Sequence, residues 1–452
     1  MGLSMNRINK LKINKPLALF ALMFSLPLSA EEIKADNHIF SSFLNDSHAD
    51  LSFRNVFKNL STEDYGERSI QTAWGQGITL DYQSGYFADM LGVDASYYGV
   101  IKLAASDDFW GRSVLYNDNG EAKGFNKLGQ LYLKGRLGDD DTYLHQYYGW
   151  QQIKKWGALN NSTRAIPSTY LGWRGEAATG PVRLRGAYVT RYSDRDSPDK
   201  IHFRTADKKE ISSIVTGELS YSDHGYSALY FLGESHNYLQ RHGMELGWQP
   251  ASWAENRLKF ASQVYYNHGL QDWTRMSTRH KTFDDDAYHY AMYAEWHAER
   301  WKHKVGASYT RASLDNGNGL GRFEWHLAKH SRGTFNSMAD SWGNDYVGDK
   351  EKMLAWTFGY AVTPEVELGM VTNYGWGMKY RGHSIERGET LVYSRWMPSQ
   401  PALKNLAFQL SGGPSWNYQS QSNQPKLTSD GKPMRAQNHS IEFQVDYKFN
   451  LF

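Results

Sequence analysis

Apolar and polar residues alternate with a period of two along most of this chain. The last segment, Asn438–Phe452, shows the pattern clearly: every odd position from Ile441 to Leu451 is apolar, and the even positions between them are polar. Successive side chains of a β-strand point to opposite faces, whereas a helix repeats about every 3.6 residues. The pattern therefore predicts an all-β protein whose strands each have one apolar and one polar face.

About eighteen segments share this alternation and are bounded by turns or loops. They are Asp50–Leu60, Gln71–Tyr82, Met90–Ala104, Lys127–Gly138, Asp141–Gln152, Ser168–Ala178, Pro181–Ser193, Ile211–Ser222, Gly225–His236, Arg241–Gln249, Asn256–Asn267, Asp286–Glu299, Lys302–Ser313, Glu351–Val362, Glu365–Trp376, Gly388–Trp396, Ala402–Trp416 and Asn438–Phe452. An even number of strands in a closed antiparallel sheet places both chain ends on the same side.

The connections between these segments alternate in length. Even-numbered connections are often mere turns, such as Asp139-Asp140 and Thr363-Pro364, whereas most odd-numbered ones are long, such as 194–210 and 315–350. A soluble sandwich has no reason to keep its long loops at one end. A transmembrane β-barrel of the outer membrane does, because its short turns face the periplasm and its long loops face outside. We therefore predict such a barrel, with about eighteen antiparallel strands.

The N-terminal residues resemble a secretory signal peptide. Four basic residues between Arg7 and Lys15 precede an apolar stretch, Pro16–Leu28, and small residues then lead to Ala30 and the acidic Glu31. The apolar stretch is shorter than the ~20 residues that a membrane-spanning helix needs. We expect residues 1–30 to be the signal peptide and 31–452 to be one barrel domain. The terminal Phe452 is the kind of residue that the outer-membrane assembly machinery reads, although it is out of phase with the apolar positions that end at Leu451.

Composition excludes several classes of protein and of binding site. The mean hydropathy of −0.65 excludes a helical membrane protein. The balance of 50 basic against 48 acidic residues argues against nucleic acid as a partner, and the absence of cysteine excludes disulfides and thiolate metal sites. No metal or cofactor is expected, since Asp315–Gly319 has the wrong spacing for a calcium loop. No nucleophile-elbow pattern occurs, so no catalytic residue is predicted.

Several segments resemble the OprD family of substrate-specific outer-membrane porins. They are Leu51–Asn55, Trp74–Gly77, Leu80–Tyr86, Met90–Asp94, Ile166–Gly172 and Arg241–Gly247. The resemblance implies an eighteen-stranded barrel whose long loops fold inward as a constriction. Within the family, Leu80–Tyr86, Met90–Ala95 and Ser341-Trp342-Gly343 are most similar to the chitoporin branch, which implies passage of chitin oligosaccharides. Sister branches favour carboxylates or basic amino acids, and these stay open as alternatives.

Charged residues on the polar face of a strand are expected to line the lumen. A charge at mid-membrane on the lipid face costs ~2–4 kcal/mol, so the charged side chains must face inward. This reasoning applies to Arg54, Arg183, Arg185, Arg191, Arg257 and Lys259. The first interpretation is a basic track for solutes, led by the three arginines of Pro181–Ser193. The alternative is that these arginines pair with lumenal acids and only brace the wall.

Two loops are candidates for the constriction. Gln151–Pro167 is the third long loop and offers Lys154, Lys155, Trp156 and Arg164. The longest loop, 315–350, is the second candidate. Either loop could instead lie exposed on the surface. Tyr265 and Tyr293 have lumenal parity and are the predicted aromatic contacts for a sugar, whereas aromatics of apolar parity are expected to form the interface belts.

These observations favour a passive uptake channel for small hydrophilic solutes. Chitin-derived oligosaccharides are the first expectation, and carboxylates or basic amino acids are the alternative. A barrel enzyme or an adhesin is the alternative of another class. The expected surroundings are the lipid bilayer and lipopolysaccharide, and the family resemblance implies a monomer.

Overall fold

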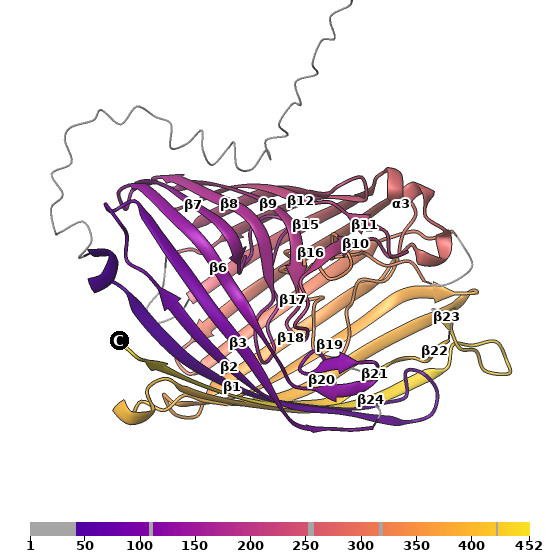
Figure 1. Cartoon of the computed structure of the whole chain (residues 1–452). Coiled ribbons are helices and arrows are strands. Elements are labelled where there is room, and N and C mark those ends of the chain that lie inside the picture. The colour runs from indigo at the N-terminus through magenta and orange to yellow at the C-terminus, as the bar shows by residue number, and fades with distance from the viewer. Residues whose placement is uncertain (1–41, 108–111, 252–256, 316–319, 422–423) are drawn as a thin grey trace, which may run out of the picture.

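The computed structural model describes residues 42–107, 112–251, 257–315, 320–421 and 424–452, and within them eighteen long strands form one closed antiparallel barrel (Figure 1). The strands are β1 (His48–Thr62), β2 (Ser69–Gln83), β3 (Leu91–Ala105), β6 (Phe125–Gly138), β7 (Thr142–Gln151), β8 (Thr169–Thr179), β9 (Val182–Ser193), β12 (Ile214–Asp223), β13 (Tyr226–Ser235), β14 (Leu239–Trp248), β15 (Arg257–Gly269), β16 (Asp286–Ala298), β17 (Trp301–Arg311), β18 (Lys352–Ala361), β19 (Val366–Tyr380), β20 (His383–Trp396), β21 (Leu406–Tyr418) and β24 (Arg435–Asn450). The predicted barrel and its strand number are confirmed.

The connections between the long strands contain short strands and helical turns. They are β4 (Tyr116–Asp118), β5 (Glu121–Lys123), β10 (Ile201–Arg204), β11 (Glu210–Ile211), β22 (Ser420–Gln421), β23 (Gln424–Pro425), the helix α3 (Gln271–Arg275), and the 3-10 turns η1 (Thr278–His280) and η2 (Pro401–Leu403). No helix in the described ranges is long and apolar enough to cross a membrane. The predicted signal peptide, 1–30, and residues 316–319 of the calcium-like motif lie outside the described residues.

The barrel closes where the first strand meets the last. Strand β1 pairs with β2 on one side and with β24 on the other, in register from Asp50 opposite Asn450 to Ser61 opposite His439. A backbone amide or carbonyl without a partner is costly in hydrocarbon, so a sheet that crosses a membrane has to be closed. The closure gives both edge strands a full ladder of hydrogen bonds.

The alternating pattern separates lipid from lumen. Large apolar side chains such as Leu184, Val305 and Val392 are more than half exposed on the outer wall. Residues of the other parity point inward, where opposite charges meet across strands: Lys58 Nζ lies 2.7 Å from the carboxylate of Glu442. The outer wall is therefore matched to hydrocarbon and the inner wall to water.

Long connections gather at one end of the barrel, opposite to the end that holds the C-terminus (Figure 1). One expectation about these connections was wrong. The predicted strands were Glu365–Trp376 and Gly388–Trp396, with residues 377–387 as a loop between them. In the structure, β19 and β20 instead continue to a two-residue turn at Arg381-Gly382, whose φ angles are 48° and 85°. A β-bulge between Gly375 and Met378 shifts the register, and the shift interrupts the alternation from which strands are predicted.

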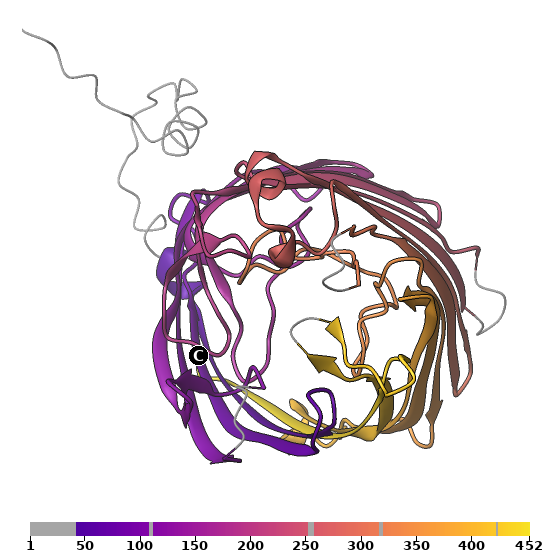
Figure 2. The same ribbon diagram turned by 90° about the vertical axis from the view of Figure 1, so that its right-hand side faces the viewer.

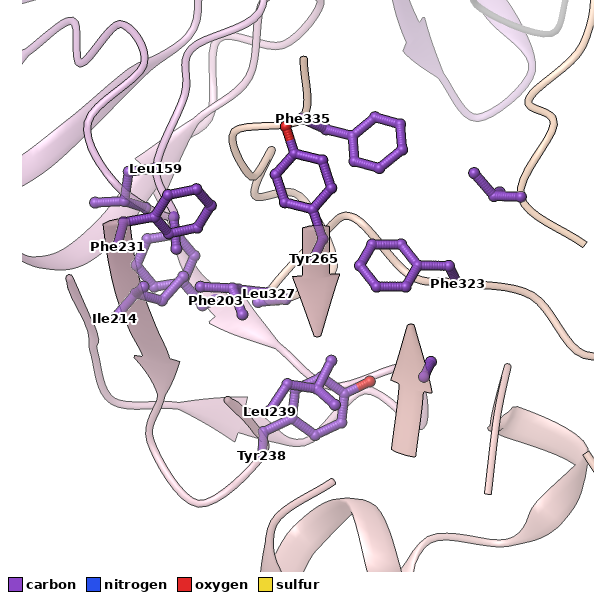
Figure 3. Packing of buried hydrophobic residues seen from close by; sticks show 14 of the residues in the cluster. Leu159, Phe203, Ile214, Phe231, Tyr238, Leu239, Tyr265, Phe323, Leu327 and Phe335 are labelled. Carbon is purple, nitrogen blue, oxygen red and sulfur yellow. The ribbon is translucent and has the colours of Figure 1, made fainter. Parts of the chain in front are cut away.

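Two of the long loops fold into the barrel. We call residues 152–168 the third loop and the described residues 312–315 and 320–351 the long loop; Figure 2 shows both inside the ring of strands. Their apolar side chains pack against inward-facing residues of the wall and form the largest buried cluster (Figure 3). Leu159 of the third loop and Phe323, Leu327 and Phe335 of the long loop join Phe231 in this cluster. The predicted inward folding is confirmed, and the hydrophobic core lies within the lumen.

We expect lipid-face charges to destabilise the barrel far more than lumenal ones. Val264 lies in the middle of β15 and is 40% exposed on the outer wall. Val264→Arg should lower the free energy of unfolding in vesicles by about 2–4 kcal/mol, because the charge enters hydrocarbon. Thr79→Arg, at a half-buried lumenal position of β2, is the control and should cost much less. Equal losses in urea titrations of the two variants would contradict the assigned faces.

Candidate constriction and lumen

The third loop crosses part of the lumen between two regions of the wall. On one side, the amide of Gly157 donates to Glu218 at 2.7 Å and the amide of Ala158 donates to Thr216 at 2.8 Å. On the other side, the loop touches β2 so closely that a Cβ placed on Gly77 would lie 2.1 Å from the carbonyl oxygen of Ala165. The wall strands therefore fix the position of the loop at both ends.

The long loop continues the constriction from the third loop. The amide of Asn160 donates to the carbonyl of Arg332 at 2.9 Å, and the hydroxyl of Thr334 donates to the carbonyl of Leu159 at 3.0 Å. The long loop is itself fixed to the wall, since the buried guanidinium of Arg241 donates to the carbonyl of Trp325 at 2.6 Å. The two loops that were alternative constriction candidates thus form one structure.

Arg164 is the predicted constriction residue with the most favourable surroundings for binding an anion. Its guanidinium forms no ion pair within the described part of the chain, and its Nε has no hydrogen-bond partner there. Burial lowers the pKa of Arg164 to about 10, and the nearby charge of Arg195 acts in the same direction. The group stays cationic at neutral pH because this pKa is still well above 7. Arg54, on the wall beside it, donates to the carbonyl of Arg164 at 3.5 Å.

Most other lumenal cations on this side have acidic partners. Arg54 pairs with Asp446 across β1 and β24. Lys58 and Glu442 form a second ion pair across the same two strands and on the same face. These pairs support the interpretation that such cations brace the wall. Arg164 differs from them because it lies on a loop and not opposite an acid in a strand ladder.

The predicted row of three arginines on β9 consists of two. Arg183 and Arg185 face the lumen and pair with Glu176, at 3.6 Å for Arg183. Arg191 was placed in the same row, but it is exposed on the other face. A bulge makes Leu171 pair with Arg191 and Gly172 with Val189, so that Thr190 is skipped and the parity reverses. The neighbouring Tyr192 is consequently buried under the loops.

The remaining basic candidates occupy different positions. Arg257 and Lys259 lie near the end of β15 that is distant from the long loops, with Lys259 opposite Glu295. Lys154 and Lys155 are exposed on the third loop. The positive charges of Lys155 and Lys259 both repel that of Lys304 electrostatically, so these three amines lie in one region of the lumen.

The aromatic candidates are less accessible than their parity suggests. Trp156 is 7% exposed and lies beneath the guanidinium groups of Arg174 and Arg185, at 4.8 and 5.2 Å. Tyr265 is fully buried, and its hydroxyl donates to Glu245 and accepts from the amide of Asn336. It therefore anchors the long loop and is closed to solutes. Tyr293 is half-buried with Lys304 Nζ 3.9 Å from its ring centre.

Several lumenal cations were missed in the sequence, among them Lys58 and Arg174. Lys58 has the same parity as Arg54, and Arg174 has the same parity as Glu176, so the alternation already placed both inward. Arg174 stacks on Tyr147 at 4.0 Å and donates to Gln151 at 2.8 Å. A systematic reading of strand parity would have found them.

Comparison with known proteins agrees with this architecture. The model of the family described as "outer membrane porin, OprD family" matches residues 41–444. The chain belongs to the OprD family. OprD-family β-barrel porins reside in the outer membrane of Gram-negative bacteria, and this is the location of the barrel.

Solved structures of similar fold include Pseudomonas aeruginosa OccK8 (OprE) and Acinetobacter baumannii OccAB1. OccK8 is 16% identical with a TM-score of 0.72, and the match covers 91% of this chain and all of OccK8. OccAB1 is 14% identical with a TM-score of 0.73, over 91% of this chain and 98% of OccAB1. These identities establish the fold alone.

A curated relative is the membrane-associated protein UidC of Escherichia coli K12. It is 32% identical over 161 residues, a match that covers 34% of this chain and only 37% of UidC. The comparisons thus support an OprD-family porin for small-solute uptake. None of the relatives named here is described as a chitoporin, and the resemblance to that branch stays a prediction.

The close approach of the third loop to β2 can be tested through pore size. Gly77→Ala would place a methyl group against the carbonyl of Ala165, so the loop has to move away from the wall. We expect a changed single-channel conductance in planar bilayers and a less stable open level. Gly99→Ala is the matched control, since a Cβ there meets no atom within 4 Å. Unchanged conductance in Gly77→Ala would contradict the contact.

Proposed function

We propose that this OprD-family porin allows small hydrophilic solutes with a negative charge to diffuse into the periplasm. The observation that carries the proposal is Arg164, whose guanidinium lies on the loop that narrows the lumen and forms no ion pair with any described residue. A guanidinium offers five donors in a planar fork that matches a carboxylate. Small carboxylates are therefore the solutes that this geometry supports best.

The surroundings of Arg164 add to the local positive potential. The charges of Arg195 and Arg332 lie close enough to affect it, and they are countered by Glu442 and Asp340. Low-dielectric walls focus the field of such groups, which raises the local concentration of anions. The same field disfavours basic amino acids, whose side chain would bring a second cation to Arg164.

A neutral saccharide is the second candidate solute. Chitin oligosaccharides were the first expectation from the sequence, but Tyr265, one of the two aromatic contacts proposed for them, is buried under the long loop. What still favours a sugar is a separate cavity that contains the half-exposed Trp342. We also propose that the porin works as a monomer, as the family resemblance implies; the pairing of β1 with β24 means that no second copy is needed to complete the barrel.

Removing the charge of Arg164 should reduce selectivity for anions. In a KCl gradient across a planar bilayer, Arg164→Gln should shift the reversal potential toward that of a cation-preferring pore. The shift should shrink at 1 M salt, where the Debye length falls from ~10 Å at 0.1 M to ~3 Å. Arg191→Gln is the control, because it removes the same charge from the outer face.

The same two variants distinguish solutes. Uptake of acetate or succinate into proteoliposomes should slow in Arg164→Gln and stay unchanged in Arg191→Gln. If Arg164→Gln keeps both the reversal potential and the carboxylate flux of the parent protein, the anion proposal fails while the barrel assignment stands.

A further inference from the structure

A cavity of about 380 Å³ lies between the long loop and the inner wall of β17 to β21. Wall residues near the ends of their strands, such as Lys304, Arg395 and Gln409, place it toward the end of the barrel distant from the long loops. The segment 336–342 of the long loop forms its other side. The cavity is therefore on the periplasmic side of the constriction, and Arg164 is not one of its lining residues.

Trp342 is unusual among the exposed apolar side chains. Most of the others lie on the outer wall, where hydrocarbon covers them, whereas Trp342 lies on a loop inside the barrel and is still 47% exposed. Leaving about half of a large ring in water forgoes part of the free energy that full burial of an apolar side chain provides. An accessible indole face in an aqueous lumen points to a ligand that covers it during transit.

Residues on both sides of Trp342 are hydrogen-bonded to the barrel wall. Asn373 of β19 donates to the hydroxyl of Ser341 at 2.7 Å, and the amide of Gly343 donates to Glu389 of β20. The side chain of Asn344 also donates to the carbonyl of Gly388 at 3.2 Å. Because residues on either side of Trp342 are fixed to the wall, a ligand does not have to order this part of the loop.

Neutral hydrogen-bonding groups supply most of the remaining lining. They are Asn336, Ser337, Ser341, Thr357, Asn373, Tyr393 and Gln409. Amides and hydroxyls both donate and accept, which matches the hydroxyl groups of a saccharide. The only carboxylate among the lining residues is Asp340, which pairs with Arg332, and the cations are Lys304 and Arg395.

We propose that this cavity is a docking site for one pyranose ring of a saccharide, with Trp342 against the apolar C–H face of the ring. An exposed indole with many neutral hydrogen-bonding groups suits a sugar better than a simple carboxylate. Lys304 and Arg395 allow the ring to carry an acidic group. The inference rests on the proposed uptake function and extends it, since it assigns a second class of contact on the way to the periplasm.

Ion-current block in planar bilayers tests the site. Chitotriose, a neutral sugar, and glucuronate, an acidic one, are added separately to the periplasmic side at 1 M KCl, where charge effects are screened. We expect brief interruptions of the current by at least one of them. Trp342→Ala should shorten the residence time roughly three- to tenfold, as for the loss of one good ring contact. Trp342→Phe, which keeps a ring, should lie between.

Two threonine variants provide matched controls. Thr357→Val removes a hydroxyl from the cavity and should also shorten the residence time, whereas Thr79→Val removes one from the lumenal face of β2 and should not. Heat-modifiable migration and the KCl conductance show that each variant is folded.

The outcomes separate this site from the anion proposal. Block by chitotriose indicates a neutral ring site, and block by glucuronate alone indicates that the cations take part. The inference is overturned if neither sugar interrupts the current of the parent protein, or if Trp342→Ala leaves the residence time unchanged. In either case the reversal potential of Arg164→Gln still tests anion selectivity independently.

Discussion

The pairing of β1 with β24 is the interaction on which the rest of this structure depends. Hydrocarbon offers no partner to a backbone amide or carbonyl, so an open sheet of this size could not cross a membrane. Twelve consecutive residues of β1, from Asp50 to Ser61, pair with β24 and remove both edges. Once the ring is closed, the parity of each strand decides whether a side chain meets lipid or the lumen.

A closed wall also determines how the loops fold. The third loop and the long loop contain large apolar residues that would be exposed to water outside the barrel. They bury these residues against the inner wall, where Tyr265 and Phe231 complete the cluster. Hydrogen bonds from Gly157, Ala158 and Arg241 then fix the two loops. The constriction is consequently a packed core with defined geometry, on which a charge such as Arg164 can be positioned.

Strand alternation and the long–short rhythm of the connections together predicted the barrel, because period-two patterning follows from the lipid and lumen faces and the long loops gather at one end. Strand alternation failed where a bulge changes the parity. Arg191 was assigned to the lumen although the skipped Thr190 turns it outward, and residues 377–387 were left out of β19 and β20 because of the bulge after Gly375. A bulge adds a residue without a distinctive sequence pattern, so one sequence does not reveal it.

The lumenal site was harder to predict than the wall for another reason. Parity placed Tyr265 inward correctly, but its burial depends on Asn336, which is 71 residues away in sequence. Trp156 was expected at the constriction surface and is instead covered by Arg174 and Arg185. Loops have no periodic pattern, and their contacts with the wall come from distant parts of the chain. Sequence therefore identified which loops narrow the lumen and could not identify which of their side chains remain accessible.

A passive channel must attract its solute and also release it, and the two proposed contacts in the lumen would meet both needs. An isolated guanidinium would hold an anion strongly, but Glu442 and Asp340 lie close enough to Arg164 to weaken its field. Charge acts over a Debye length of ~8 Å at physiological ionic strength, so it can select solutes before they touch the wall. The ring of Trp342 acts only on contact. In this arrangement the long-range charge of Arg164 acts at the constriction and the short-range ring contact of Trp342 acts beyond it. Because the two act at different places, neither has to bind the solute tightly, and rapid passive transit requires weak binding.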